Sequence, residues 1–409
     1  MDAKTDQTSA GALEPSGVLP RVLFYSHDTF GLGHLRRSRA LATAITRAYP
    51  SISSIIMTGS PVAGRFAFPE HVDHVRLPGV TKNEEGHYVS QTLGLDIDDT
   101  TNLRAGIIKA TTENFRPDLL IVDKEPTGFR GELIPALEWL KAHSSSKIVL
   151  GLRDVLDSPD ILADEWARKG AVEAAETFYD EVWIYGLREI YDPTIGLDLS
   201  DAFRARMHWT GFLRRDTVSV SKIDDDPYIL VTPGGGGDGA LLVDLVVSAY
   251  EQDRDLMPKA RIVYGPFLSG AVREKFENRI ARLDGRVEAV GFESQIESLF
   301  AGALGVVAMG GYNTFCEILS FDKPALIVPR TFPRKEQYIR AKQAEERQLV
   351  RMLDENRDGF DAQSMSRAIR ALLSQRPPSA SRFAGLLDGL DYVTARTGKL
   401  IPNLENVST

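Results

Sequence analysis

Short runs of aliphatic and β-branched residues alternate with longer amphipathic segments from Arg21 onward. In the first half, the runs predicted as strands are RVLFYS, SIIMT, DLLIVD, KIVLGLR and EVWIYG. In the second half, they are YILVT, ARIVYG, RVEAVG, GVVAMG, PALIVP and LVRML. Continuous apolar strands separated by helices are typical of parallel sheets with helices on both faces. The pattern therefore predicts an α/β protein with two doubly wound, Rossmann-like domains that face a central cleft, where such sheets bind ligands.

A charged segment without apolar periodicity, TVSVSKIDDD, separates the two series of strands. We interpret residues 217–226 as a linker between a first domain, residues 21–216, and a second domain, residues 227–375. A chain of 409 residues is long enough for two such cores. Residues 1–20 are predicted to form a flexible tail, and residues 376–409 carry a further helical pattern that could pack back on the first domain.

Composition excludes several classes of protein. The sequence is 43% hydrophobic and 26% charged, which is typical of a soluble globular protein. It has no apolar run near the roughly 20 residues of a membrane span and no signal-peptide pattern, so we expect a cytoplasmic protein. Peripheral contact with a membrane stays open. A net charge of −9 argues against a nucleic-acid partner.

Cysteine and histidine positions limit the possible metal sites. The single cysteine, Cys316, excludes an internal disulfide and a multi-cysteine site, and it is interpreted as a small apolar helix residue. All seven histidines lie between His27 and His208, so any histidine that acts as an acid or base belongs to the first domain. His71 and His74 lack a matching pair of ligands. We therefore expect no metal.

Two strand-to-helix turns of the second domain are rich in glycine. GGGGDG, Gly234–Gly239, follows YILVTP, and Gly310 and Gly311 lie between GVVAM and YNTFCEIL. Backbone N–H groups at such turns, with a helix N-terminus behind them, can bind a diphosphate. Neither turn is a Walker loop or a GxGxxG motif. Thr314 and Glu317 follow the second turn, and a carboxylate at Glu317 can accept two hydrogen bonds from a ribose diol, although the helix dipole alone also favours an acid there.

The run MGGYNTFCEILSFDKPALIVPRTFPRKEQYIRAKQ resembles the donor-binding region of GT-B glycosyltransferases of family 28, which includes the peptidoglycan lipid II N-acetylglucosaminyltransferase. TPGGGGDGA resembles the glycine-rich loop of that family's second domain, and GLGH resembles the loop after its first strand. These matches cover most of residues 21–350. The resemblance implies that the first domain binds an acceptor and the second binds a nucleotide-sugar, specifically a UDP-sugar.

The resemblance also assigns residues to the substrate site. The positions that match the family's donor-binding segments are Gly235, Gly236, Gly237, Phe292, Gly310, Gly311, Tyr312, Asn313, Thr314, Glu317 and Gln337. Glu317 matches a ribose-binding glutamate and Gln337 a glutamine that contacts the donor sugar. Lys335 and Glu336 replace an aspartate–histidine pair of the family, which leaves the sugar open. Arg214 matches an arginine near the phosphates, with a solvated linker residue as the alternative, and Phe292 could instead be a core aromatic.

Glycosyl transfer requires a base that deprotonates the acceptor hydroxyl. The candidates are His34, Asp123, Glu125 and Asp154. His34 and Gly33 lie at the first strand-to-helix turn, which faces the cleft, although His34 could also cap a helix or bind phosphate. The carboxylates and Arg153 follow predicted strands of the same sheet, so we expect them at the same edge, where they bind the acceptor or assist the base.

Two further features have ordinary interpretations. Helical periodicity places Leu35, Ser38, Ala42 and Ile45 on one face, so Arg36, Arg37 and Arg39 are predicted to form a solvated face, with an anionic acceptor or a membrane as alternative partners. LDIDD contains the Asp-x-Asp metal signature of the other large glycosyltransferase fold, but it lies in a polar loop of the first domain, and we set it aside.

The sequence thus predicts a metal-independent, inverting glycosyltransferase that moves a sugar from a UDP-sugar to an acceptor hydroxyl, in polysaccharide or glycoconjugate synthesis. No cofactor is expected beyond the UDP-sugar co-substrate, and the acceptor is open among a sugar, a lipid-linked molecule and a small molecule. One alternative is a nucleotide-sugar hydrolase, because GLGHLRRSRALA also resembles the loop of the hydrolase of pseudaminic acid synthesis. The other is a non-catalytic subunit that binds a nucleotide-sugar.

Overall fold

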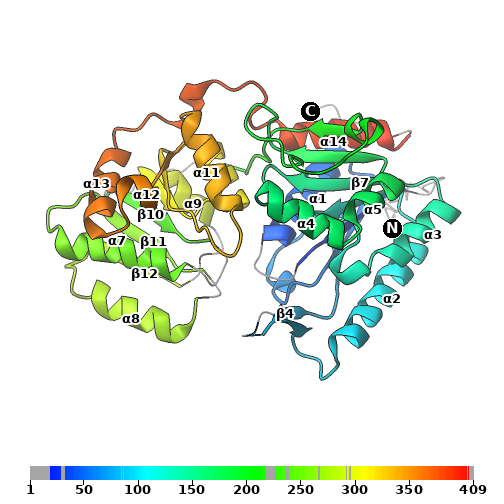
Figure 1. Cartoon of the computed structure of the whole chain (residues 1–409), viewed down its shortest axis with the longest axis horizontal. Helices are drawn as coiled ribbons and strands as arrows, with labels where there is room; N and C mark the ends of the chain where they lie inside the picture. Colours follow the sequence, from blue (N-terminus) through cyan, green and yellow to red (C-terminus); the bar gives the residue numbers. More distant parts are fainter. Residues whose placement is uncertain are drawn as a thin grey trace, which may run out of the picture.

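The computed structural model contains two α/β domains that lie side by side (Figure 1). It describes residues 19–28, 33–83, 85, 87–217, 226–234, 239–265, 268–291, 293, 296–402 and 404. Each domain has its own parallel sheet, packed against helices. The predicted α/β class with two doubly wound domains is confirmed.

The first sheet has seven strands in the order β3-β2-β1-β6-β7-β8-β9, and all neighbours are parallel. Its strands are β1 (Arg21–Ser26), β2 (Ser53–Thr58), β3 (Val72–Arg76), β6 (Leu119–Asp123), β7 (Lys147–Arg153), β8 (Glu181–Tyr185) and β9 (Met207–Trp209). Its helices are α1 (Gly33–Ala48), α2 (Ile97–Phe115), α3 (Ile134–His143), α4 (Pro159–Arg168), α5 (Ala171–Phe178) and α6 (Asp201–Arg204). The strand order reverses between β1 and β6, and the segments that follow these strands diverge there to form a crevice.

The second sheet has six parallel strands in the order β12-β11-β10-β13-β14-β15. Its strands are β10 (Tyr228–Thr232), β11 (Lys259–Val263), β12 (Val287–Val290), β13 (Gly305–Ala308), β14 (Ala325–Ile327) and β15 (Arg351–Met352). Its helices are α7 (Ala240–Gln252), α8 (Gly270–Ile280), α9 (Ile296–Gly302), α10 (Tyr312–Ser320), α11 (Glu336–Glu346), α12 (Glu355–Asp358) and α13 (Ala362–Leu372). Here the order reverses between β10 and β13, which are the strands that precede the two glycine-rich turns.

Every predicted strand is present, but several short strands were not predicted. β3 lies at the sheet edge, and its exposed Asp73 interrupts the apolar run that identifies a buried strand. β9 has only three residues. The antiparallel hairpin of β4 (Val80–Lys82) and β5 (Tyr88–Ser90) is equally short. Such segments are too short to show a clear period.

The C-terminal helix α14 (Gly389–Leu400) lies with the first domain rather than the second (Figure 1). It packs against α1, and its Arg396 forms an ion pair with Glu181 of β8. The chain therefore crosses between the domains twice, once after β9 and once before α14. Residues 1–18 of the predicted tail and 218–225 of the predicted linker lie outside the described residues.

A continuous apolar cluster joins the two domains. It runs from Leu35 and Ala42 of α1 to Phe315 of α10. Phe212 packs edge-on against Phe315, with ring centroids 5.2 Å apart. Among the described helices, none is both long and apolar enough to cross a bilayer.

Candidate active site

His34 lies in the first turn of α1, at the point where the first sheet reverses its strand order. Its Nδ1 atom is hydrogen bonded to Oδ2 of Asp123, the last residue of β6. An ionised carboxylate can only accept, so Nδ1 carries the proton and donates it. The Nε2 atom has no hydrogen-bond partner among the described residues, and the side chain is 15% exposed. This is the arrangement of a histidine whose second nitrogen is available to a substrate.

Arg37 also holds Asp123. Its Nε and Nη2 atoms lie 2.8 and 2.7 Å from Oδ1, and Nη2 also lies 2.8 Å from Oδ2. Burial alone would raise the pKa of Asp123, but the charge of Arg37 and the hydrogen bond from His34 hold it well below its usual value. Asp123 therefore stays ionised and orients His34.

Burial lowers the pKa of His34 to about 4, and Asp123 only partly offsets this effect. The buried ring of His27 packs edge-on against His34 at 5.8 Å, and burial also holds the pKa of His27 well below its usual value. Both imidazoles are neutral at neutral pH. A neutral imidazole with a free Nε2 can accept a proton from a hydroxyl.

The other two candidate bases, Asp154 and Glu125, form ion pairs with cationic side chains. Asp154 accepts two bonds from Arg340 of α11, at 2.7 and 2.6 Å, and both side chains are almost fully buried. Glu125 lies 3.0 Å from Lys124 and 2.8 Å from Lys169. Burial would raise the pKa of Glu125, but the lysines lower it. Because a carboxylate paired in this way is a weak base, the geometry favours His34.

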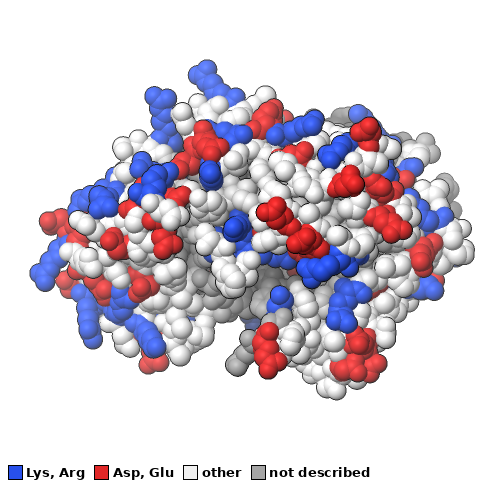
Figure 2. Space-filling view, in the orientation of Figure 1, with Lys and Arg blue, Asp and Glu red and all other residues white. Residues whose placement is uncertain are grey.

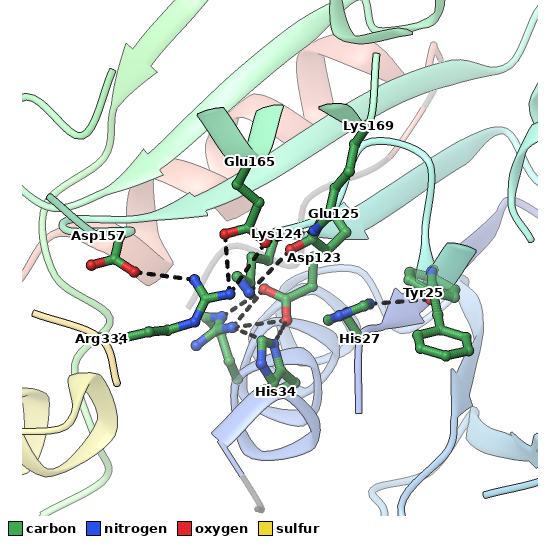
Figure 3. A network of polar contacts seen from close by, with 12 residues as sticks. Tyr25, His27, His34, Asp123, Lys124, Glu125, Asp157, Glu165, Lys169 and Arg334 are labelled. Carbon is green, nitrogen blue, oxygen red and sulfur yellow. Dashed lines mark hydrogen bonds and ion pairs between the residues drawn. The ribbon is translucent and has the colours of Figure 1, made fainter. Parts of the chain in front are cut away.

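An ion-pair network surrounds His34 and crosses from one domain to the other (Figure 3). Arg334, in the segment before α11, lies 3.4 Å from Asp157 and 3.1 Å from Glu165 of α4. Glu165 in turn lies 2.6 Å from Lys169. Figure 2 shows a hollow between the domains, with Lys and Arg side chains gathered around it. The cleft is therefore lined by charged groups, most of which are already paired.

The second domain presents a tight turn to this cleft. Gly310 has φ +78°, and a Cβ atom there would lie 2.7 Å from Cγ2 of Ile327, so only glycine fits. Gly311 precedes the first turn of α10, whose N-terminal N–H groups favour an anion. The binding of a diphosphate at this turn stays a prediction.

Glu317 of α10 is 1% exposed, and its carboxylate pairs with Arg36 of α1. A ribose diol would have to displace Arg36 or share the carboxylate with it. The predicted solvated arginine face is therefore wrong. Arg36 and Arg37 have buried carboxylate partners, and Arg39 lies over the ring of Phe66.

Asn313 and Tyr312 contact the first domain. The Asn313 Nδ2 atom donates to the Gly33 carbonyl at 3.1 Å, and its Oδ1 atom accepts from Arg215 at 2.7 Å. The guanidinium groups of Arg37 and Arg340 each lie over the buried ring of Tyr312, 5.5 and 5.8 Å from its centroid. Both residues therefore join the domains, in addition to their place beside the turn.

The arginine expected near the phosphates is not Arg214. Its side chain is 53% exposed and points to Asp391, 3.5 Å away. Arg215 is buried and contacts Asn313 instead. Consecutive side chains of an extended segment point in opposite directions, so a shift of one residue exchanges the buried side chain for the exposed one.

The remaining predicted site residues are distributed around the same cleft. Thr314 is buried in the first turn of α10. Gln337 is buried at the start of α11 and accepts a hydrogen bond from the Arg330 backbone at 3.1 Å. Arg153 ends β7, and no described residue is a hydrogen-bond partner of its buried Nε atom. The predicted contacts at Gly235, Gly236, Gly237 and Phe292 lie outside the described residues.

The described residues contain no group of three or more histidine, cysteine, aspartate or glutamate side chains that could hold a metal ion. The Asp-x-Asp pattern of LDIDD marks the start of a helix. Asp96 caps α2 by accepting from the Asp99 N–H at 2.7 Å, and Asp98 pairs with Arg130.

Three residues that form ion pairs in the site were not predicted as site residues. For two of them, the spacing from a predicted site residue on the same helix indicates their position. Arg37 follows His34 by three residues, which places both on the same side of α1. Arg340 has the same spacing from Gln337 in α11. Lys169 follows α4 and reaches Glu125 through a tertiary contact that no local pattern indicates.

The second domain is similar to a known family of domains. Residues 228–382 match the model of the glycosyltransferase family 28 C-terminal domain. No curated protein matches the chain in a sequence search.

Several solved structures share the fold across nearly the whole chain. A UDP-glucosyltransferase from Polygonum tinctorium aligns with TM-score 0.62 and 12% identity over 95% of this chain and 96% of that chain. A UDP-N-acetylglucosamine 2-epimerase aligns with TM-score 0.60 and 12% identity over 93% and 95%. The calicheamicin glycosyltransferase CalG4 aligns with TM-score 0.57 and 16% identity over 93% and 96%. The chain therefore has the GT-B fold, and residues 228–382 match the glycosyltransferase family 28 C-terminal domain.

Proposed function

We propose that this chain is a metal-independent, inverting glycosyltransferase that moves a sugar from a UDP-sugar to an acceptor hydroxyl. One observation carries the proposal. A neutral His34, oriented by Asp123 through Nδ1, has its Nε2 atom without a partner among the described residues, beside the turn of a family 28 domain.

In the proposed reaction, Nε2 of His34 takes the proton of the acceptor hydroxyl as its oxygen attacks the anomeric carbon. The bond between that carbon and the diphosphate oxygen breaks, and UDP leaves with the bonding electrons. Asp123 stabilises the imidazolium that forms. A single displacement inverts the configuration at the anomeric carbon.

The leaving diphosphate is stabilised by groups from both sides of the cleft. The N-terminus of α10 and the turn at Gly310 and Gly311 supply backbone N–H donors, and Arg215 supplies a positive charge nearby. These groups make a divalent ion unnecessary. Glu317 binds the ribose once Arg36 has moved away. The UDP assignment is also supported by a solved relative in fold, Phytolacca americana UGT2, whose structure is a complex with UDP-2fluoro-glucose.

The acceptor is a sugar, a lipid-linked molecule or a small molecule, and the product belongs to polysaccharide or glycoconjugate synthesis. The proposed reaction takes place in the cytoplasm, with or without peripheral contact with a membrane, and involves no nucleic acid and no cofactor.

The first test is a thermal-shift panel of UDP-, GDP- and TDP-sugars, because a ligand stabilises a protein according to its concentration relative to its Kd. We expect stabilisation by UDP and UDP-sugars. UDP release is then measured over an acceptor panel, with and without EDTA, and NMR gives the anomeric configuration of the product. His34→Ala should abolish release but keep UDP binding. His143→Ala, an exposed histidine in the last turn of α3, is the matched control.

Other outcomes would replace the proposal. Stoichiometric UDP and free sugar without any acceptor would assign a nucleotide-sugar hydrolase, in which His34 activates water. UDP binding without turnover on any acceptor would favour a non-catalytic subunit. A chain that binds neither UDP nor its sugars would contradict the donor assignment.

A further inference from the structure

Arg153 is a positive charge in the cleft that has no partner among the described residues. It is the last residue of β7, beside the turn that follows Asp123 in β6. Its Nε atom is buried without a hydrogen-bond acceptor, and its guanidinium makes no hydrogen bond or ion pair with any residue that the structure describes. Burial lowers its pKa to about 10, so it nevertheless remains charged at neutral pH.

The other cations around it have carboxylate partners. Arg37 is held by Asp123, and Arg340 by Asp154. Lys124 pairs with Glu125. These carboxylates are already used, so none of them can rotate to Arg153 without leaving another buried cation alone.

Arg153 also lies close to the reacting groups. Its charge lowers the pKa of His34, which places the two side chains within electrostatic reach of each other. The acidic neighbours that affect its own pKa are Glu336 and Asp123. The Oε1 atom of Glu336 forms an ion pair with Arg330, at 2.6 Å. Its other oxygen, Oε2, is buried without a hydrogen-bond partner among the described residues. Arg153 is therefore within electrostatic reach of both His34 and Glu336, and each of Arg153 and Glu336 has a buried polar atom without a hydrogen-bond partner among the described residues.

The guanidinium of Arg153 is only partly buried, but its Nε atom has lost its water and gained no hydrogen-bond acceptor, which carries a free-energy cost. Such a cost is typical of a site whose ligand supplies the missing partner. The planar guanidinium suits a carboxylate or a phosphate, to which it can donate two parallel hydrogen bonds. A neutral hydroxyl would leave the charge uncompensated.

We propose that Arg153 binds an anionic group of a substrate, a carboxylate or a phosphate, next to the hydroxyl that His34 deprotonates. The substrate of this site is then an acidic or phosphorylated sugar. This inference rests on the proposed function and names the substrate class within it. The unpaired Oε2 of Glu336 would accept a hydroxyl of the same sugar.

The anionic group has two possible sources, the transferred sugar of the donor and the acceptor. We do not assign Arg153 to the diphosphate of UDP. The turn at Gly310 that faces it is contacted by Arg340, and Asn313 beside that turn is contacted by Arg215. Arg153 makes neither contact. We therefore expect UDP affinity to be independent of Arg153.

The experiment compares the full-length wild type with Arg153→Gln, Arg153→Lys and Arg116→Gln. Arg116 is an exposed arginine that precedes β6, at the sheet edge opposite the cleft, and is the matched control. Calorimetry measures the Kd of UDP, UDP-glucose and UDP-glucuronate. Ligand-observed NMR measures binding of glucose, glucuronate and glucose 6-phosphate, each with and without saturating UDP.

We expect the wild type to bind an anionic probe more tightly than its neutral counterpart by about 10- to 100-fold, the range for a hydrogen-bonded charge. Arg153→Gln should abolish this preference and leave UDP affinity unchanged, Arg153→Lys should keep part of it, and Arg116→Gln should keep all of it. A preference for UDP-glucuronate over UDP-glucose would place the anion on the donor, and a preference among free probes would place it on the acceptor. The melting temperature of ligand-free Arg153→Gln should not fall, because the variant removes an uncompensated charge.

Two results would overturn the inference. One is a wild type with no preference for any anionic probe. The other is an Arg153→Gln variant with weakened UDP affinity, which would assign Arg153 to the diphosphate. If UDP does not bind but an anionic probe binds through Arg153, the proposed function fails and the anion site stands.

Discussion

Replacing Asp123 by asparagine gives a strict test of the proposed base. Arg37 directs three donated hydrogen bonds at this carboxylate, so the amide oxygen of the introduced side chain should face Arg37. Its NH2 group would then face Nδ1 of His34. Nη2 of Arg37, which lies 3.0 Å from the same nitrogen, is a second donor there. With only donors around it, Nδ1 must become an acceptor, and the proton moves to Nε2.

The expected loss of kcat follows from this change of the His34 tautomer. A protonated Nε2 cannot take a proton from the acceptor, so only the residual rate from positioning and electrostatics remains. The same inversion costs about 10⁴-fold in the serine-protease triad. Allowing for partial rotation of the amide, we expect kcat to fall by about 10²- to 10⁴-fold, which is about 3–5 kcal/mol at about 1.4 kcal/mol per tenfold. UDP affinity should be unchanged, because Asp123 bonds to His34 and Arg37 and contacts neither Glu317 nor the turn at Gly310.

The assay has two independent measurements. UDP release under saturating donor gives kcat, and NMR of protein labelled with ¹⁵N-histidine gives the tautomer of His34 without any substrate. The control is Asp198→Asn, at an exposed aspartate between α5 and α6. A variant with at least half of the wild-type kcat would refute the role of Asp123. A variant that is slow but keeps its proton on Nδ1 would refute the tautomer argument.

Three further predictions concern charged groups of the cleft. Burial lowers the pKa of His34 to about 4. Because the base must be unprotonated, kcat/KM should fall as the pH drops through about 4. A pH profile in which kcat/KM already falls near the usual histidine pKa would contradict this prediction. Arg36→Ala removes the ion pair that occupies Glu317, so UDP binding measured by calorimetry should tighten by about 2- to 5-fold, the range for a partly exposed ion pair. Weaker UDP binding would show instead that Arg36 helps to hold the donor. Asp154→Asn leaves Arg340 buried without a carboxylate and should destabilise the protein by about 3–5 kcal/mol. The double variant Asp154→Leu/Arg340→Met should recover the lost stability. An unchanged melting temperature in Asp154→Asn would contradict this prediction.

Much of the fold could be predicted because its strands are buried on both faces. Runs such as DLLIVD and KIVLGLR become β6 and β7, in which nearly every residue is buried. Two of the strands that were missed, β3 and β9, have exposed or partly exposed residues that break the apolar run. Their presence depends on a neighbouring strand rather than on their own pattern.

The site was predictable in its location but not in its pairing. Position after a strand is sufficient to bring His34, Asp123 and Asp154 to one edge of a sheet. Which cation meets which carboxylate depends on the other domain, because Asp154 pairs with Arg340 and Glu317 with Arg36. The partners in each pair lie far apart in the sequence, and no local period reports such a contact.

The amide of Asn313 has a consequence for protein engineering. Asn313 belongs to the second domain, and its amide binds two groups of the first, the Gly33 carbonyl and the Arg215 side chain. The two domains are therefore not interchangeable modules. A hybrid enzyme that took a foreign donor domain would lose this bridge, unless the residues on both sides of the seam were transplanted together.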